Sequence, residues 1–330
     1  MSKFTTTLKL ATVAAIASAI SVQASAAMEL KAVTGLQQTN TLAISFLIHF
    51  KDAVNARGKG VVSVNYLGGQ NIVPPRKAAK ALKRGQFDML HSPTAYYIGL
   101  VPEGYAMTAA NVTPAEVRAN GGWKILEEVF EKKAGSHLIA WGESGSQYNM
   151  YLMFDPKLDK DGVPDLAGVN MRATGTYRPL FKALGASTIN MKSSEIYTGL
   201  QRGVVKGFGW PNVAIVPLGL HKIVKYRISP PFYHSNNVVT MNLDSWAKLS
   251  REAKSLINSV ALEYEKNSAA FMEEQRLEEE KIVLASGVKD IKLTGGAAKK
   301  YLSIAYSEIW KQLKKRSEYS DKLHAKFYRP

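Results

Sequence analysis

The chain has 330 residues, a formal net charge of +16, 46% hydrophobic residues and no cysteine. A chain of this length can bury one large core or two ordinary ones, and it gains nothing from disulfides. The basic charge would attract anions of any kind. However, the lysines are spread over several predicted helices rather than interleaved with aromatic residues on one motif. The composition therefore excludes a small disulfide-stapled protein, and we expect no nucleic-acid partner.

The N-terminus has the pattern of a secretory signal peptide. Lys3 and Lys9 come first, the apolar run LATVAAIASAISV follows, and Ala24-Ser25-Ala26 supplies a small-residue cleavage site. A membrane anchor is the alternative, but the run is short and is interrupted by Ser and Thr. We therefore predict a signal peptide over residues 1–26 and export of a mature chain that begins near Ala27.

Two series of alternating strands and helices follow. The first has strands at 30–35, 61–68 and 87–92 with helices at 40–57 and 74–85. The second begins at the strand 146–154 and continues with strands and helices through residues 169–210. An alternating pattern of this kind predicts a parallel sheet covered by helices. Residues 81–92 and 199–210 also resemble each other, each a helix ending in Arg-Gly, a short strand and a turn. We therefore predict two α/β lobes with a ligand cleft between them.

A long helical segment follows the second series. Residues 244–282 have helical periodicity without Pro or Gly. At 1.5 Å per residue, a helix of ~35 residues spans roughly 50 Å, which exceeds one lobe of this size. The segment must therefore run across both lobes or protrude. A coiled coil is the alternative, but the apolar spacing does not follow a strict heptad.

The sequence has few signs of catalytic or metal chemistry. It contains no P-loop, no GxGxxG after a strand, no HExxH and no GxSxG. The six histidines are scattered at no metal-ligand spacing. We therefore expect neither an enzyme nor a metal or cofactor site, although an exported enzyme acting on a small acid stays an alternative.

Four residues are candidates for ligand recognition. Arg172 ends a predicted strand with no acid nearby in sequence, and its guanidinium matches a carboxylate in two parallel hydrogen bonds. A structural ion pair with a distant acid is the alternative role. Gln147 and Asn149 lie two apart on a strand and so face the same side. If that side is the cleft, the two amides can hydrogen-bond a small polar ligand, and if it is not they are exposed edge residues. Trp210 ends the strand of the second Arg-Gly unit and could form a wall of the cleft.

The stretch DLAGVNMRATGTYRPLFKALGASTINMKSSEIYTGLQRGVVKGFGWP (165–211) resembles the signature region of the DctP-type solute-binding proteins of TRAP transporters. The likeness extends over the mature chain, including GQFDM at 85–89 and the long late helix. It implies an α/β, bilobal, periplasmic binding protein-like fold with a long helix spanning both lobes. We place lobe I in 27–149 plus 236–275 and lobe II in 150–235 plus 276–330.

The resemblance also implies a function. Such proteins are periplasmic, close on a small organic acid, and pass it to the membrane subunits of a permease driven by a sodium gradient. The family's carboxylate-clamping arginine corresponds to Arg172. We expect a monomer with this role, and a sensory or adaptor protein is the weaker alternative.

Departures from the family pattern point to the ligand. Gln147 stands where many dicarboxylate and sialate members have a second arginine, which favours a monocarboxylate over a C4-dicarboxylate or sugar acid. Trp210 is similar to members that bind 2-oxo acids and other monocarboxylates, and an apolar or aromatic ligand could rest on it. Gly209 replaces a glutamate of the metal site in those members, so we expect no cation. By position, four further residues could line the cleft: Gln37, Ser92, Tyr96 and Asn236.

Overall fold

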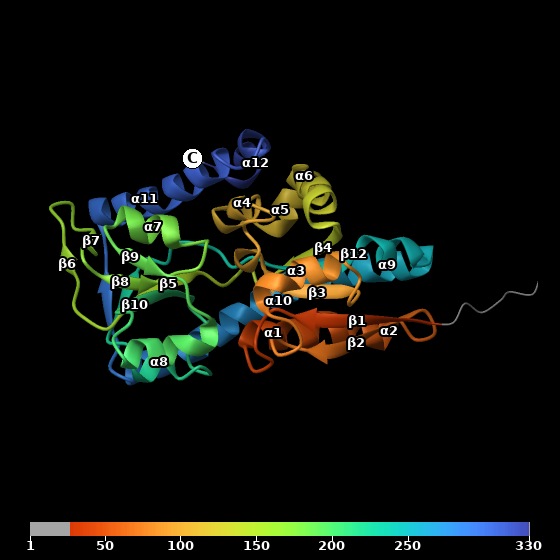
Figure 1. Ribbon diagram of the computed structural model, residues 1–330, viewed down its shortest axis with the longest axis horizontal. Helices are drawn as coiled ribbons and strands as arrows, with labels where there is room; N and C mark the ends of the chain where they lie inside the picture. The colour runs from red at the N-terminus through yellow and green to blue at the C-terminus, as the bar shows by residue number, and fades with distance from the viewer. Residues whose placement is uncertain (1–26, 330) are drawn as a thin grey trace, which may run out of the picture.

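The computed structural model describes residues 27–329 and has two lobes, each built around a β-sheet (Figure 1). The predicted signal peptide lies outside the described residues. The sheet of lobe I has the order β2 (Val62–Gly68), β1 (Met28–Thr34), β3 (Met89–Pro93), β12 (Asn237–Asn242), β4 (Ser136–Gly142). β1 is parallel to both of its neighbours, whereas β12 is antiparallel to β3 and β4. A strand from late in the chain thus completes the first sheet.

The sheet of lobe II is mixed as well. Its order is β13 (Lys289–Lys292), β11 (Tyr226–Ser229), β5 (Tyr148–Leu152), β10 (Gly207–Pro211), β8 (Asn170–Arg172), β9 (Ser187–Ile189). β10, β8 and β9 are parallel neighbours, and β5 runs antiparallel to β10 and β11. A small hairpin, β6 (Lys157–Leu158) with β7 (Pro164–Asp165), lies beside it. The carboxyl ends of β8 and β10 therefore lie together, next to the start of β5.

Helices cover both sheets (Figure 1). The predicted helix 40–57 forms as α1 (Thr41–Phe46), a π-helical turn (Leu47–Asp52) and α2 (Ala53–Arg57). Asn40 caps it, because its side-chain oxygen accepts a hydrogen bond from Leu42 N. The other helices of lobe I are α3 (Pro75–Lys83), α4 (Gly104–Thr108), α5 (Pro114–Ala119) and α6 (Gly122–Val129). Lobe II contributes α7 (Arg178–Ala183) and α8 (Ile196–Gln201).

The long segment is two helices rather than one. Ser250 caps the second of them through a hydrogen bond from Ala253 N, which separates α9 (Leu243–Lys248) from α10 (Arg251–Ala285). α10 packs Ile257 and Tyr264 into the core of lobe I and Val283 into that of lobe II. At 35 residues it is ~52 Å long. The predicted helix that spans both lobes is confirmed, and with it the bilobal α/β fold.

The C-terminal helices α11 (Gly295–Lys314) and α12 (Ser320–Phe327) lie across the lobes on the side opposite α8 (Figure 1). α11 packs on α7 of lobe II and on α4 of lobe I, and α12 packs on α4 and α6. Residues 320–327, which we assigned to lobe II, therefore lie against lobe I. No helix within residues 27–329 is both long and apolar enough to cross a membrane.

Two extended segments also join the lobes. The chain passes from β4 to β5 through residues 143–147 and returns from β11 to β12 through residues 230–236. The two segments pair with each other in one bridge between Gln147 and His234. Apolar residues of both lobes meet nearby around α10, where they form one cluster: Leu36, Leu42, Ala43, Val213, Ala214 and Met272.

Candidate functional site

A small pocket lies between the lobes at the carboxyl ends of β8 and β10. Its volume is about 40 Å³. We call it the Arg172 pocket, and its lining residues are Leu36, Asn40, Leu42, Pro93, Ala95, Tyr96, Tyr148, Arg172, Thr174, Tyr177, Trp210, Pro211 and Asn237. Both lobes contribute to this lining, and none of these residues is acidic. The pocket is far smaller than the 300–1,000 Å³ typical of ligand sites, so the lobes lie close together in this structure.

Arg172 is the charged residue of the pocket. It is the last residue of β8 and its side chain is 1% exposed. Its Nε donates to Met191 O at 3.2 Å and its Nη1 donates to the hydroxyl oxygen of Tyr177. Among residues 27–329 it forms no ion pair with an Asp or Glu, which is rare for a buried guanidinium. The alternative role of Arg172 as one half of a structural ion pair therefore finds no partner in the described chain.

Aromatic rings surround the guanidinium. Its central carbon lies 5.6 Å from the ring centroid of Trp210 and 6.0 Å from that of Tyr177, within the range of cation–π attraction. Tyr96 and Tyr148 complete the wall. Burial raises the pKa of both phenols, although the charge of Arg172 partly opposes this for each of them. Tyr96 and Tyr148 are therefore neutral at pH 7, and Arg172 is the one cationic residue of the lining.

Tyr177 is held firmly in place. It is 2% exposed, and its ring packs against Phe181 at 5.5 Å and Tyr148 at 5.8 Å between centroids. Gly209 makes room for it, since a Cβ at that position would lie only 3.0 Å from the Tyr177 ring. The sequence pattern did not single out Tyr177, because a tyrosine that begins a helix has no signature of its own.

Two buried side-chain polar atoms of the pocket residues have no hydrogen-bond partner within residues 27–329. These buried atoms are Thr174 Oγ1 and Asn237 Oδ1, from lobe II and lobe I respectively. Native proteins rarely leave buried polar atoms unpaired, so such atoms point to a missing partner. Asn237 was not predicted, whereas its neighbour Asn236 was. The Asn236 amide instead donates to Gly104 O and to Thr108 Oγ1, because successive strand residues face opposite sides.

Gln147 and Asn149 lie outside the Arg172 pocket. They do share one side, as strand alternation predicts, but they line a separate hollow with Arg227, Arg276 and other polar residues. Asn149 is buried and donates from Nδ2 to Ile228 O at 2.9 Å. The residue between them, Tyr148, lines the pocket instead. In this structure the two amides therefore do not line the cavity that contains Arg172, and their role in ligand binding stays a prediction.

The remaining predicted residues are divided between the pocket and its surroundings. Trp210 and Tyr96 line the pocket together with Arg172. Ser92 is buried behind the wall, where its hydroxyl donates to Pro93 O at 3.4 Å. Gln37 lies in the turn before α1, and its carbonyl accepts from Asn40 N. Neighbours of these two residues, Pro93 and Leu36, line the pocket in their place.

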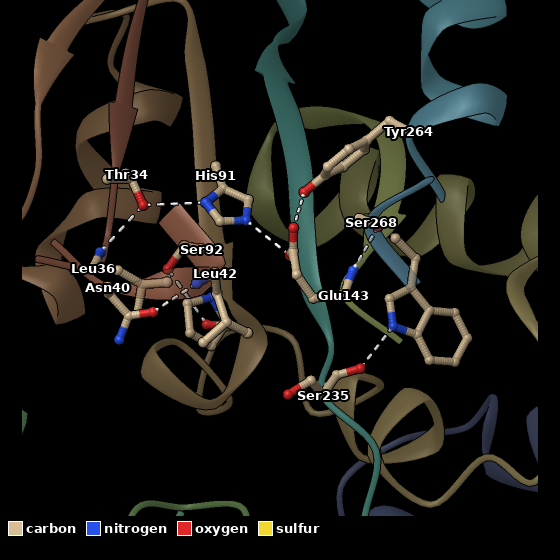
Figure 2. A network of polar contacts seen from close by, with 12 residues as sticks. Thr34, Leu36, Asn40, Leu42, His91, Ser92, Glu143, Ser235, Tyr264 and Ser268 are labelled. Atoms are coloured by element: carbon tan, nitrogen blue, oxygen red, sulfur yellow. Dashed lines mark hydrogen bonds and ion pairs between the residues drawn. The ribbon is translucent and has the colours of Figure 1, made fainter. Parts of the chain in front are cut away.

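A buried polar network connects the pocket wall of lobe I to α10 (Figure 2). Thr34 Oγ1 accepts from Leu36 N and lies 3.1 Å from His91 Nδ1. His91 Nε2 lies 3.1 Å from Glu143 Oε2, and the Tyr264 hydroxyl of α10 donates to Glu143 Oε1 at 2.6 Å. The chain of bonds thus ties the first residues of the β4–β5 crossing to both the pocket and the long helix.

A second anchor connects α10 to the pocket wall of lobe II. The buried carboxylate of Glu279 accepts from Ala214 N, Ile215 N and Val216 N at 2.7–3.0 Å. The carbonyl of Ala214 in turn accepts from Trp210 Nε1 at 3.2 Å. Glu279 therefore holds the loop that orients Trp210 toward Arg172.

Comparisons with known proteins agree with this architecture. The family model "Bacterial extracellular solute-binding protein, family 7" (DctP) matches residues 34–316. A solute-binding protein of Albidiferax ferrireducens is 22% identical over 289 residues, covering 84% of this chain and 83% of that protein. A monocarboxylate 2-oxoacid-binding periplasmic protein of Nostoc is 24% identical over 206 residues, covering 58% of this chain and 54% of that protein.

Two solved structures are close in fold. A TRAP transporter solute-binding protein from Bordetella bronchiseptica, with copurified calcium and picolinate, has a TM-score of 0.81 at 18% identity and covers 92% of this chain and 91% of its own. A TRAP periplasmic solute-binding protein from Desulfovibrio salexigens with bound orotic acid has a TM-score of 0.78 at 19% identity, covering 90% and 96%. Since the family model matches most of its length, the chain belongs to bacterial extracellular solute-binding protein family 7, the DctP family.

Proposed function

We propose that this protein captures a small organic acid with one carboxylate and delivers it to the membrane subunits of a TRAP permease. The observation that carries the proposal is Arg172, a buried guanidinium with no carboxylate partner in residues 27–329. A buried charge is costly unless it is paired. A ligand carboxylate would supply the missing anion through charge-assisted hydrogen bonds.

The charge of the pocket supports one carboxylate rather than two. Arg172 is the only cationic side chain among the lining residues, and that lining contains no Asp or Glu. A second carboxylate would enter the pocket without a counter-charge, which costs free energy on desolvation. A metal cation would meet the charge of Arg172 without an anionic side chain to bind it. We therefore propose that the acid binds without a resident cation or other cofactor.

The walls support an acid with a compact apolar or aromatic body. Trp210, Tyr96 and Tyr148 present ring surfaces on which such a body can pack. The solved structures with bound picolinate and orotic acid show that other proteins of this fold hold flat carboxylates. Because the pocket has a volume of only about 40 Å³, we expect the lobes to move apart as the ligand enters.

A thermal-shift screen of the purified mature protein tests the proposal. A ligand that binds only the native state raises the melting temperature. The panel contains monocarboxylates, C4-dicarboxylates and sugar acids at equal concentration. We expect stabilisation by one or a few monocarboxylates, followed by a single-site isotherm in calorimetry. Stabilisation by dicarboxylates or sugar acids alone would contradict the single carboxylate, and no stabilisation by any acid would contradict the proposal as a whole.

Export, partners and the lack of catalysis need separate measurements. We propose that residues 1–26 are removed on export to the periplasm and that the mature protein is a monomer. N-terminal sequencing of the protein from periplasmic extracts and its mass in solution test these points. Incubation of the bound acid with the protein, followed by NMR, tests the exported-enzyme alternative. A product would favour that alternative, whereas recovery of the unchanged acid supports a carrier.

A further inference from the structure

A second hollow on lobe I borders the Arg172 pocket. Its volume is about 290 Å³, and its lining residues include Arg76, Lys80, Tyr96 and Tyr97. We call it the Arg76 hollow. Arg76 and Lys80 are exposed, so the hollow opens to solvent. Tyr96 lines both cavities and is therefore the wall that they share. The Arg76 hollow is close to the size of a small ligand site, roughly 300 Å³ or more, whereas the Arg172 pocket is not.

The Arg76 hollow has two positive charges and no negative one. Arg76 and Lys80 lie four residues apart on α3, so their side chains share one face of the helix. Neither α3 nor the lining of the hollow contains an Asp or Glu. Within residues 27–329 neither cation belongs to an ion pair. Like charges at this spacing repel each other, and an anion bound beside them offsets that repulsion.

The wall of the hollow contributes a hydrogen-bond donor as well. Tyr97 is 6% exposed, and its hydroxyl oxygen is buried without a hydrogen-bond partner in the described part of the chain. Burial raises the pKa of Tyr97, so the hydroxyl keeps its proton at pH 7. Native proteins rarely leave a buried polar atom unpaired. Two cations and an unpaired O–H around one hollow form a donor set that suits a carboxylate, which only accepts.

The hollow lies at the rim of the cleft, close to Arg172. Arg76 Nη2 donates to Asn190 Oδ1, an exposed contact between α3 of lobe I and the residue that follows β9 of lobe II. The next residue, Met191, accepts from Arg172 Nε through its carbonyl. Neighbouring residues of one loop thus contact the outer and the inner guanidinium. Burial raises the pKa of the Tyr96 phenol, and the charges of both arginines oppose that rise, so Tyr96 lies near both.

We propose that the Arg76 hollow is an outer binding site for the ligand's carboxylate, which Arg76 and Lys80 hold before the acid passes Tyr96 and reaches Arg172. When the lobes close, Asn190 takes the place of the carboxylate at Arg76. Because both cations are exposed, the outer site increases the rate of capture more than the final affinity. This inference rests on the proposed binding of an organic acid at Arg172 and adds the route by which the acid arrives.

Stopped-flow tryptophan fluorescence tests the inference, because Trp210 lines the Arg172 pocket and reports on binding there. The probes are picolinate, orotate and benzoate. Arg76→Gln should lower the association rate constant about 3- to 10-fold at an ionic strength of about 0.01 M, where charges act over about 30 Å. The deficit should shrink to less than about 2-fold at about 1 M, where that length is about 3 Å. Arg76→Lys keeps the charge and should retain the association rate of the parent.

Lys77→Gln is the matched control. Lys77 is exposed on the same helix and does not line the hollow, so the substitution removes an equal charge at the wrong place. It should keep the association rate of the parent. An equal fall in Lys77→Gln and Arg76→Gln would mean that only net charge matters. An effect of Arg76→Gln on dissociation alone would make Arg76 a latch between the lobes. Either result overturns the inference while acid binding at Arg172 stands, and failure of the parent to bind any probe overturns both.

Discussion

At the scale of single residues, the chain contains two buried arginines with opposite surroundings. Arg172 has a carbonyl and a phenol as partners, whereas Arg227 donates to Asp290 at 3.0 Å and to Glu280 at 3.0 Å. Both are less than 10% exposed. The first has the surroundings expected of a ligand anchor and the second those of a structural ion pair, so substitution should separate the two roles.

Arg172→Ala should lose ligand binding without loss of stability. Removing a clamp on a buried carboxylate weakens binding by ~100-fold or more, which corresponds to about 3 kcal/mol. The free energy of unfolding of the ligand-free protein should stay the same or rise, because a buried cation without an anionic partner is removed. Calorimetry and urea unfolding measure the two quantities.

Arg227→Ala provides the contrast for this experiment. The substitution leaves Asp290 and Glu280 without their cation. The free energy of unfolding should therefore fall by about 2 kcal/mol or more. Arg227→Ala should weaken ligand binding less than Arg172→Ala does. A loss of stability in Arg172→Ala as large as that in Arg227→Ala would identify Arg172 as a structural residue.

The site residues show what sequence alone can predict at this scale. Arg172 is the last residue of β8 and Trp210 the last but one of β10, its parallel neighbour. The carboxyl ends of such strands form a cleft, so both residues could be placed there from the sequence. The alternation of β5 correctly grouped Gln147 with Asn149. It could not show which side of the strand faces the cleft, because that depends on where β11 packs, far away in sequence.

At the scale of elements, α10 serves as a support for the loop that carries Trp210. The Glu279 carboxylate accepts hydrogen bonds from three backbone N–H groups of this loop. Within the loop, Ala214 adopts a positive φ of 61°. Such a conformation is unfavourable for a residue with a Cβ and persists only where its surroundings fix it. The carboxylate on the neighbouring helix provides that restraint.

Glu279→Gln should therefore affect both stability and binding. One carboxamide oxygen replaces two carboxylate oxygens, so at least one buried N–H is left without an acceptor, at a cost of about 1–3 kcal/mol. The loop then holds Trp210 less precisely, and the affinity for the ligand should fall as well. Glu278→Gln is the matched control, since that side chain is exposed and pairs only with Lys281. Equal melting temperatures for the two variants would contradict the role of Glu279.

Secondary structure was easier to predict than its interruptions. The helical pattern of residues 40–57 and 244–282 was clear, but the π-helical turn at Leu47–Asp52 and the cap at Ser250 were not predicted. The π-helical turn keeps the local period close to helical, so it leaves the apolar pattern intact. At Leu249 and Ser250 the backbone is extended, but the break is only two residues long and contains neither Pro nor Gly. The two interruptions are set by packing against the sheet of lobe I and by a single side-chain hydrogen bond.

At the scale of the whole molecule, the lobes are joined by α10 and by two crossing segments that pair with each other. The similarity between residues 81–92 and 199–210 predicted two lobes, because each lobe needs its own strand–loop unit to form one side of a cleft. It did not predict that α12 returns to lobe I. Nothing in an amphipathic helix specifies which of two similar lobes it covers.

His234 lies where the crossing segments pair. Its Nδ1 lies 3.1 Å from Ser144 O, and a carbonyl can only accept, so Nδ1 carries the proton of the neutral ring. Nε2 is then free to accept from the Gln147 amide at 3.4 Å. Burial lowers the pKa of His234 from its usual 6.5, although the bond to Ser144 opposes this. The folded protein therefore favours the neutral ring.

The stability of the joined lobes should consequently fall in acid. Above pH 6.5 the ring is neutral in both states, and as the pH drops from 6.5 toward the lower pKa of the folded state the unfolded chain binds the extra proton more readily than the folded one. His234→Gln removes this linkage, so its free energy of unfolding should fall less between pH 7.5 and pH 5 than that of the parent. Because other titrating groups contribute equally to both curves, their contributions cancel in the difference. One such group is Glu265, since burial raises its pKa. Exposed His324→Gln should follow the parent curve. Identical slopes for the parent and His234→Gln would show that the crossing does not sense pH.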